Sequence, residues 1–126
     1  MSGRILYIED NFDNRILIKR VLEAEGYAVI EAENGNTGLS KFADGKYDLI
    51  LMDINLPDID GYECTSRIRK LSGVERVPIV ALTANVMEGD KLKAMDAGCD
   101  GYISKPIDVD NLPVQVAAYM NHRKPA

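Results

Sequence analysis

The chain contains no long hydrophobic run and no excess of basic residues. No apolar segment among its 126 residues reaches the roughly 20 residues that a membrane-spanning helix needs, and no charged-then-apolar leader opens it. Asp and Glu number 20 against 15 Lys and Arg, for a net charge of -5, whereas nucleic-acid-binding proteins present basic patches. Basic residues do gather at Arg67, Arg69, Lys70 and Arg76, which we interpret as a solvated helix face. We therefore expect a cytoplasmic protein that binds neither membranes nor nucleic acids.

Cysteine is scarce as well, because Cys64 and Cys99 are the only two. Their separation matches neither a metal-binding pattern nor a CxxC redox motif. We interpret both as free thiols in a reducing compartment, although the sequence leaves a disulfide between them open.

Short apolar runs alternate with amphipathic segments along the chain. The runs cover residues 4–9, 28–32, 48–53, 77–83 and 101–104. Several are continuous and rich in β-branched residues, as is typical of strands that are buried on both faces of a sheet. No repeat, linker or low-complexity stretch interrupts the alternation, so we expect one domain over residues 1–126.

Apolar residues at helical spacing follow each run, and we interpret these stripes as core-facing. The first consists of Leu17, Ile18, Val21 and Leu22 and ends at Gly26-Tyr27. The second helix opens at Asn34-Gly35 and contains Leu39 and Phe42; the third carries Cys64, Ile68 and Leu71; the fourth runs from about Met87 to Ala97, before Gly98; the fifth contains Leu112, Val116, Tyr119 and Met120. Five strands alternating with five helices predict an α/β fold, a doubly wound parallel sheet with helices on both faces.

The carboxyl ends of the predicted strands carry polar residues. The first run ends in Glu9-Asp10, the third in Asp53, the fourth in Thr83 and the fifth in Ser104-Lys105-Pro106. In a parallel α/β sheet the binding crevice lies at the carboxyl ends of the strands. We therefore expect three carboxylates, one hydroxyl and one ammonium group at the same rim.

This set of groups suits phosphoryl transfer. Crowded carboxylates repel each other, and a hard divalent cation such as Mg²⁺ relieves that repulsion. The ammonium of Lys105 suits a phosphate oxygen, and an aspartate such as Asp53 can hold an acyl phosphate. Taken singly, each residue has a structural alternative: Glu9-Asp10 as a helix cap, Asp53 as a turn residue, Thr83 as an ordinary strand residue, and Lys105 as a solvated lysine. Their joint occurrence at four strand ends favours the functional interpretation.

Five segments resemble the receiver domain of response regulators in two-component signalling. They are Ile-Glu-Asp-Asn at 8–11, Asp-Leu-Ile-Leu-Met-Asp at 48–53, Leu-Pro-Asp-Ile-Asp-Gly-Tyr-Glu at 56–63, Val-Ala-Leu-Thr-Ala at 80–84 and Tyr-Ile-Ser-Lys-Pro at 102–106. The resemblance covers nearly the whole chain and implies a flavodoxin-like strand order of 2-1-3-4-5.

The resemblance also implies a role for each residue at the rim. Asp53 is expected to be the phosphoacceptor, and Lys105, aimed by a cis bond before Pro106, to pair with the phosphoryl oxygens. Thr83 would turn its hydroxyl toward the new phosphate. Tyr102 would then rotate inward and change the face formed by the fourth helix, fifth strand and fifth helix.

The same resemblance implies a site for Mg²⁺ or Mn²⁺. Asp10 and Asp53 would bind the ion directly, together with the backbone carbonyl of Asn55. Glu9 would act on the ion through water.

The partners that the resemblance implies are proteins. A histidine kinase or a histidine phosphotransfer domain would supply the phosphoryl group, and a downstream effector would read the signal. The chain is expected to be a switch rather than an enzyme. A stand-alone regulator and the receiver of a hybrid histidine kinase both stay open, since Glu9-Asp10-Asn11 followed by Asn14-Arg15 resembles both.

Two other function classes are disfavoured by single features. A phosphatase that turns over through an aspartyl phosphate often has a second aspartate two residues after the nucleophile, where this chain has Asn55. A flavodoxin-like cofactor carrier would need a phosphate-binding first turn, but residues 10–14 are acidic and lack glycine.

Two residues of the predicted helices conflict with helical propensity. Gly38 should weaken the second helix by about 1 kcal/mol, and the family usually has a small alanine-like residue there. Pro113 removes a hydrogen bond if the last helix is capped by Asp108, and is harmless if the regular helix begins near Asp110 or later.

Overall fold

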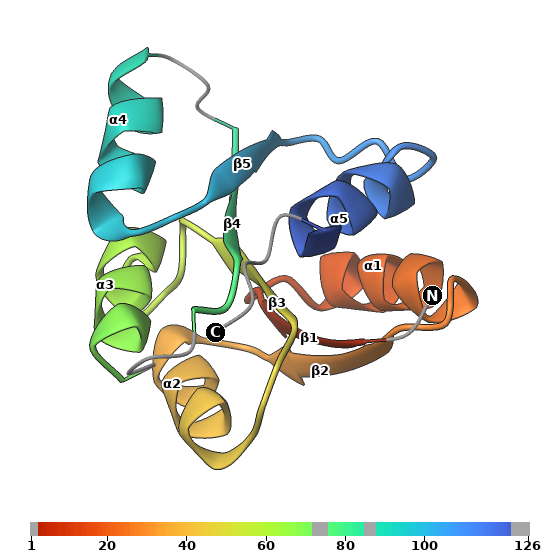
Figure 1. Cartoon of the computed structure of the whole chain (residues 1–126), viewed down its shortest axis with the longest axis horizontal. Coiled ribbons are helices and arrows are strands. Elements are labelled where there is room, and N and C mark those ends of the chain that lie inside the picture. Colours follow the sequence, from red (N-terminus) through yellow and green to blue (C-terminus); the bar gives the residue numbers. More distant parts are fainter. Residues whose placement is uncertain (1–2, 72–75, 85–87, 122–126) are drawn as a thin grey trace.

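The computed structural model describes residues 3–71, 76–84 and 88–121, over which five strands alternate with five helices (Figure 1). The strands are β1 (Arg4–Ile8), β2 (Ala28–Ala32), β3 (Leu49–Asp53), β4 (Ile79–Thr83) and β5 (Gly101–Ser104). The helices are α1 (Phe12–Ala24), α2 (Gly35–Asp44), α3 (Gly61–Leu71), α4 (Glu88–Ala97) and α5 (Leu112–Asn121). All paired strands are parallel, in the order β2-β1-β3-β4-β5, which confirms the predicted α/β fold and strand order. Met87, the predicted start of the fourth helix, lies outside the described residues.

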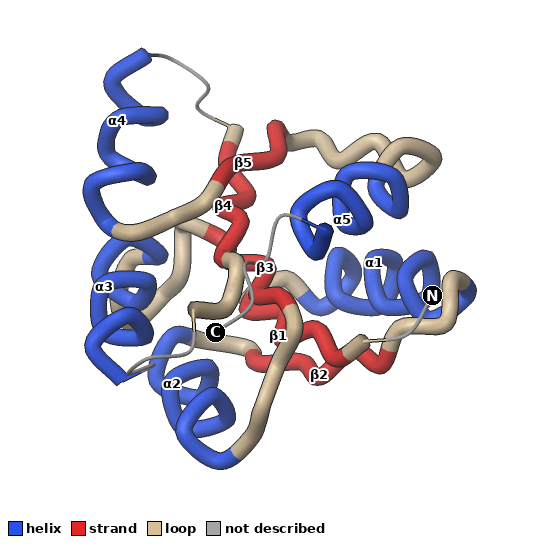
Figure 2. The backbone as a smooth tube through the Cα atoms, viewed as in Figure 1, coloured by secondary structure: helices blue, strands red, loops and turns tan. Residues whose placement is uncertain are grey.

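Helices cover both faces of the sheet, α1 and α5 on one side and α2, α3 and α4 on the other (Figure 1, Figure 2). Each face has its own core. Buried helix residues on the first side are Ile18, Leu22, Leu112 and Val116, and on the second side Cys64, Ile68 and Ala94. The doubly wound arrangement is therefore confirmed.

Two interior strands, β3 and β4, explain the continuous apolar runs. β3 and β4 are buried over their whole length, and alternate residues of each strand enter the two cores. On β1, for example, Leu6 and Ile8 pack on the α2 side, whereas Ile5 and Tyr7 pack on the α1 side. The only polar residues within β3 and β4, Asp53 and Thr83, stand at the carboxyl ends of these strands.

The first two helices begin at asparagine caps. The side-chain oxygen of Asn11 accepts a hydrogen bond from the Asn14 N–H at 2.9 Å, and Asn34 accepts one from the Thr37 N–H at 2.8 Å. Such caps satisfy backbone donors that have no partner inside the helix. Because Asn11 caps α1, the preceding Glu9 does not cap that helix.

The glycine and proline of the helices both have structural explanations. A Cβ on Gly38 would lie 2.5 Å from Cδ1 of Ile8, so the glycine lets α2 approach β1 closely. Pro113 is the second residue of α5, where the first turn needs no N–H donor. The later of the two predicted starts for the last helix is therefore the observed one.

Three predictions about side-chain environment were wrong. Leu17 is 48% exposed, because Ile18 and Leu22 define the buried line of α1 and Leu17 lies beside it. Leu71 is 58% exposed, because it is the last residue of α3 and extends beyond the core. Arg69 does not belong to a solvated face: its side chain is mostly buried and forms an ion pair with Asp100 at 2.7 Å.

The two cysteines are free, as predicted, and both are buried. Burial raises the pKa of the Cys64 thiol to about 12, so it stays protonated. No helix within the described ranges combines the length and apolar character needed to cross a membrane.

Candidate functional site at the carboxyl ends of the strands

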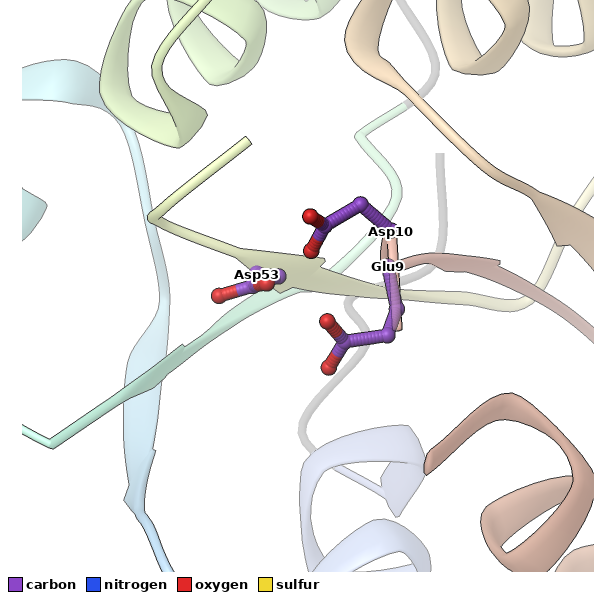
Figure 3. A group of neighbouring side chains, drawn as sticks. All are labelled: Glu9, Asp10 and Asp53. Atoms are coloured by element: carbon purple, nitrogen blue, oxygen red, sulfur yellow. The ribbon is translucent and has the colours of Figure 1, made fainter. Parts of the chain in front are cut away.

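Three carboxylates meet where β1 and β3 end (Figure 3). These strands are neighbours, with Ile8 opposite Met52, so the residues that follow the pair fall at the same level of the sheet. Glu9, Asp10 and Asp53 each offer a carboxylate oxygen within 4.8 Å of the others. Glu9 and Asp53 are buried, whereas Asp10 lies at the surface. The sequence therefore predicted this cluster correctly as a spatial group.

Lys105 reaches the cluster from the end of β5. Its Nζ donates to Oδ1 of Asp53 at 3.1 Å and to Oε1 of Glu9 at 3.4 Å. The Lys105 N–H also donates to the Thr83 carbonyl at 2.8 Å, which joins the ends of β4 and β5. The peptide bond between Lys105 and Pro106 is cis. One ammonium group thus bridges two carboxylates from different strands.

The pKa values of Glu9 and Lys105 are both raised where these charged groups lie close together. Burial, followed by the hydrogen bond and the negative charge of Asp53, raises the pKa of Glu9 to about 7. Burial alone would lower the pKa of Lys105, but Asp53 and then Glu9 raise it above its ordinary value. A positive group is therefore stabilised at this rim, as expected where carboxylates outnumber cations.

Asp53 and its neighbours define the remaining part of the rim. The Asn55 N–H donates to Oδ1 of Asp53 at 3.2 Å. Thr83, at the end of the adjacent strand β4, is buried and pairs in register with Ser104. The roles expected for Asn55 and Thr83 stay predictions.

Tyr102 lies on β5 between two helices. Its ring packs partly buried against the core on the α4 side, and Nζ of Lys91 lies 5.2 Å from the ring centroid. Its carbonyl accepts a hydrogen bond of 3.5 Å from the Tyr119 hydroxyl on α5. Tyr102 therefore contacts both helices of the face that it is expected to change.

Two residues that contact the acidic groups were not predicted. The hydroxyl of Tyr7, inside the core, donates to Oε1 of Glu9 at 3.4 Å. Arg15 of α1 donates to the backbone carbonyls of Glu9 and Asp10. The contact of Tyr7 could have been found from the sequence, because a tyrosine stands out among the apolar residues of this strand. No local sequence pattern indicated the contacts of Arg15.

The donor set fits a hard divalent cation. Oxygen ligands of Mg²⁺ lie about 2.1 Å from the ion, so two of them are at most about 4.2 Å apart. Carboxylate oxygens within 4.8 Å of one another therefore suit direct binding by some groups and water-mediated binding by others. A site of this kind can hold a cation next to the Asp53 carboxylate.

Comparison with known proteins identifies relatives over almost the whole chain. Residues 5–117 match the model of the response regulator receiver domain. The polar-differentiation response regulator DivK of Brucella anthropi is 36% identical over 120 residues, which cover 95% of this chain and 98% of that protein.

Two solved structures add information about the site. The receiver domain of a sensor histidine kinase from Pseudomonas aeruginosa, with a magnesium ion in its active-site cleft, is 36% identical, with a TM-score of 0.86 and coverage of 96% of this chain and 99% of that one. The receiver domain of Ssk1 from Saccharomyces cerevisiae, co-crystallised with the histidine phosphotransfer protein Ypd1, is 30% identical, with a TM-score of 0.88 and coverage of 95% and 90%.

Proposed function

Because the chain belongs to the family of response regulator receiver domains, we propose that it is a phosphoacceptor switch in which Asp53 is the phosphorylated residue. The observation that carries this proposal is the buried Asp53 carboxylate, held 3.1 Å from the Lys105 ammonium and beside two further carboxylates. Phosphoacceptor signalling in two-component systems is the role of the family, so the proposal concerns the residues and partners through which this chain performs it.

In the proposed reaction, a carboxylate oxygen of Asp53 attacks the phosphorus atom of a partner's phosphohistidine. An O–P bond forms and the P–N bond breaks; the imidazole leaves with the electron pair and takes up a proton. The Lys105 ammonium already lies against Oδ1 of Asp53. It is therefore placed to neutralise negative charge on a phosphoryl oxygen bound there.

We propose that the acidic cluster binds Mg²⁺, or Mn²⁺ in its place. Asp10, Asp53 and the backbone carbonyl of Asn55 would bind the ion, and Glu9 would act through water. When bound, the ion supplies positive charge that neutralises the phosphoryl oxygens. The spacing of the carboxylates supports this assignment, as does the magnesium ion in the related Pseudomonas receiver.

The proposed output is a change in the face formed by α4, β5 and α5. Thr83 would turn its hydroxyl toward the phosphate, and Tyr102 would move inward. The contact of the Tyr102 ring with Lys91 on α4 and the hydrogen bond of the Tyr102 backbone carbonyl with Tyr119 on α5 support this route, because a movement of Tyr102 would affect contacts with both helices. A downstream effector protein would bind the altered face.

The proposed phosphoryl donor is a histidine kinase or a histidine phosphotransfer domain. The complex of the related Ssk1 receiver with Ypd1 supports a donor of the second kind. We propose a switch rather than an aspartyl-phosphate phosphatase, because Asn55 cannot act as the general acid that such an enzyme needs. The free, buried thiols support a reducing compartment, and we propose a single receiver domain acting in the cytoplasm.

Phosphorylation with a small acyl phosphate tests the assignment. The full chain is incubated with acetyl phosphate and Mg²⁺ and its intact mass is measured. We expect the wild-type chain to gain the mass of one phosphoryl group, and we expect neither Asp53→Asn nor the wild-type chain in excess chelator to gain it. Absence of the added mass from the wild-type chain, or equal labelling of Asp53→Asn, would overturn the assignment.

A further inference from the structure

The β1–α1 turn must place Asp10 without help from the side chains around it. Asp10 lies at the surface, and within the described ranges no residue donates a hydrogen bond to its carboxylate. Glu9 differs, because Tyr7, Lys105 and the Asn11 N–H all donate to its carboxylate. The direction of the Asp10 side chain therefore depends on the backbone of the turn.

Arg15 fixes that backbone. Its Nη1 donates to the carbonyl of Glu9 at 2.8 Å and to the carbonyl of Asp10 at 3.1 Å. These two consecutive peptide groups flank the Cα atom of Asp10, so the two bonds restrict the torsions that aim its side chain. The Arg15 side chain is only 12% exposed, which strengthens the hydrogen bonds that its charged group donates.

Arg15 is itself held from two sides. Its Nε lies 3.6 Å from Oε1 of Glu31 on β2, and its guanidinium carbon lies 5.7 Å from the centroid of the Phe12 ring. The planar guanidinium group can serve the carbonyls and Glu31 at once, because it carries five donors in a fixed geometry. A lysine ammonium in its place lacks that geometry.

We propose that Arg15 is a positioning residue for the divalent-cation site. It holds the β1–α1 turn so that Asp10 presents its carboxylate to the ion beside Glu9 and Asp53, and Glu31 in turn holds Arg15. The inference rests on the proposed metal site and adds to it a residue that does not touch the ion.

A role through charge and a role in holding the turn predict opposite effects of removing Arg15 on cation binding. Arg15 carries a positive charge close to the cation site, so if it acted only through its charge, its removal would tighten cation binding. If it acts by holding the turn, its removal lets Asp10 move and weakens binding. The direction of the change in Mg²⁺ affinity therefore separates the two effects.

The test is isothermal titration of the full chain with Mg²⁺, with thermal unfolding of each variant measured in parallel. Arg15→Met keeps an apolar stem against Phe12, and we expect its dissociation constant for Mg²⁺ to rise about tenfold, within the usual range for groups that orient metal ligands. Arg15→Lys keeps the charge and should raise the constant about threefold. Glu31→Gln should raise it by an intermediate amount.

Lys19→Met is the matched control. Lys19 also pairs with Glu31, at 3.3 Å, but within the described residues it makes no hydrogen bond or ion pair with the turn, so its loss should leave the dissociation constant unchanged. Unchanged or tighter binding in both Arg15 variants would overturn the inference while leaving the metal site intact. If Arg15→Met fails to fold, Arg15→Lys alone decides, and wild-type affinity in that variant overturns the inference. No binding of Mg²⁺ by the wild-type chain would instead overturn the metal site itself, and the inference with it.

Discussion

Tyr7 places a hydroxyl inside the core, directly below the acidic rim. The residue is fully buried and its hydroxyl donates to Oε1 of Glu9 at 3.4 Å. Tyr7→Phe removes that group with no other change of shape. We expect the free energy of unfolding to fall by about 1 kcal/mol, since a buried acceptor loses one of its donors. Urea denaturation at neutral pH measures this difference.

Tyr27→Phe is the control for this substitution. Tyr27 lies in the same core, but within the described residues no group is paired with its hydroxyl. Its replacement should therefore change the free energy of unfolding by only a few tenths of a kcal/mol, as is usual away from specific contacts. Equal losses for the two variants would show that the bond to Glu9 contributes nothing measurable.

Among the individual residues of the site, those at the ends of strands could be predicted from the sequence. Asp53 and Lys105 are far apart in the sequence, but parallel strands bring their ends to one edge, so topology alone placed them together. Arg15 was not predictable in this way. Its bonds go to backbone carbonyls, and any residue type can supply a carbonyl, so no sequence pattern marks the contact.

At the scale of elements, α2 depends on a residue from a distant loop. Asp58, between β3 and α3, accepts hydrogen bonds of 2.8 Å from the N–H groups of Gly35 and Asn36. These are backbone donors that the first turn of a helix leaves unpaired. Although burial by itself would raise the pKa of Asp58, the N–H groups of Asn36 and Gly35 hold it below its ordinary value.

The predicted consequence is a pH-dependent cap. Asp58→Ala should lower the free energy of unfolding by about 1 kcal/mol at pH 7, a typical value for a lost helix cap. Because the pKa of Asp58 is lower in the folded state, its contribution is fully present above the ordinary pKa near 4 and is lost as pH falls through the folded value. Urea denaturation from pH 7 to pH 3.5 should therefore show a constant difference in free energy of unfolding between the wild-type chain and Asp58→Ala that begins to narrow below about pH 4.

Asp58→Asn is the matched variant for this prediction. It keeps the shape and one oxygen acceptor but cannot titrate, so its stability relative to Asp58→Ala should stay constant over the same pH range. A gap between the wild-type chain and Asp58→Ala that does not narrow with falling pH would contradict the charged cap.

The strands were predicted almost to the residue, because buried parallel strands read as continuous apolar runs. Helix faces were less predictable. Leu17 and Leu71 fit helical spacing, but whether a residue at the edge or the end of a stripe is covered depends on how the helix lies on the sheet. That angle follows from packing between distant elements, for which periodicity within one helix carries no information.

For the whole molecule, the candidate site and a cluster of hydrogen bonds around Asp100 lie at opposite ends of the sheet. The acidic rim lies at the carboxyl ends of the strands, whereas Asp100 precedes β5 at the amino ends. Asp100 accepts hydrogen bonds from Arg69 at 2.7 Å, from Arg76 at 2.7 Å and from the Ile79 N–H at 2.8 Å. This carboxylate therefore connects α3 with the starts of β4 and β5.

Arg69 is the residue on which that connection depends most. Besides Asp100, its guanidinium donates to the carbonyls of Gly98 at 2.9 Å and Val77 at 2.6 Å. We expect Arg69→Met to lower the free energy of unfolding by about 3 kcal/mol, because the substitution removes the hydrogen bonds to Asp100, Gly98 and Val77, each of which contributes about 1 kcal/mol. For a chain of this size the midpoint of thermal unfolding should then fall by about 10 °C. Arg67→Met is the matched control, since Arg67 lies on the same helix but makes only a half-exposed pair with Glu63 at 3.0 Å.

The control should change the free energy of unfolding by no more than about 0.5 kcal/mol, as is usual for exposed pairs. Below its melting temperature, Arg69→Met should still gain the phosphoryl mass from acetyl phosphate at the wild-type rate, because its contacts lie at the end of the sheet away from the rim. Calorimetry and intact-mass kinetics on the same samples separate the two effects. Equal melting temperatures for Arg67→Met and Arg69→Met would show that the buried pair adds no more than a surface pair. Slower labelling of Arg69→Met at a temperature where it is folded would show that the two ends of the sheet are coupled.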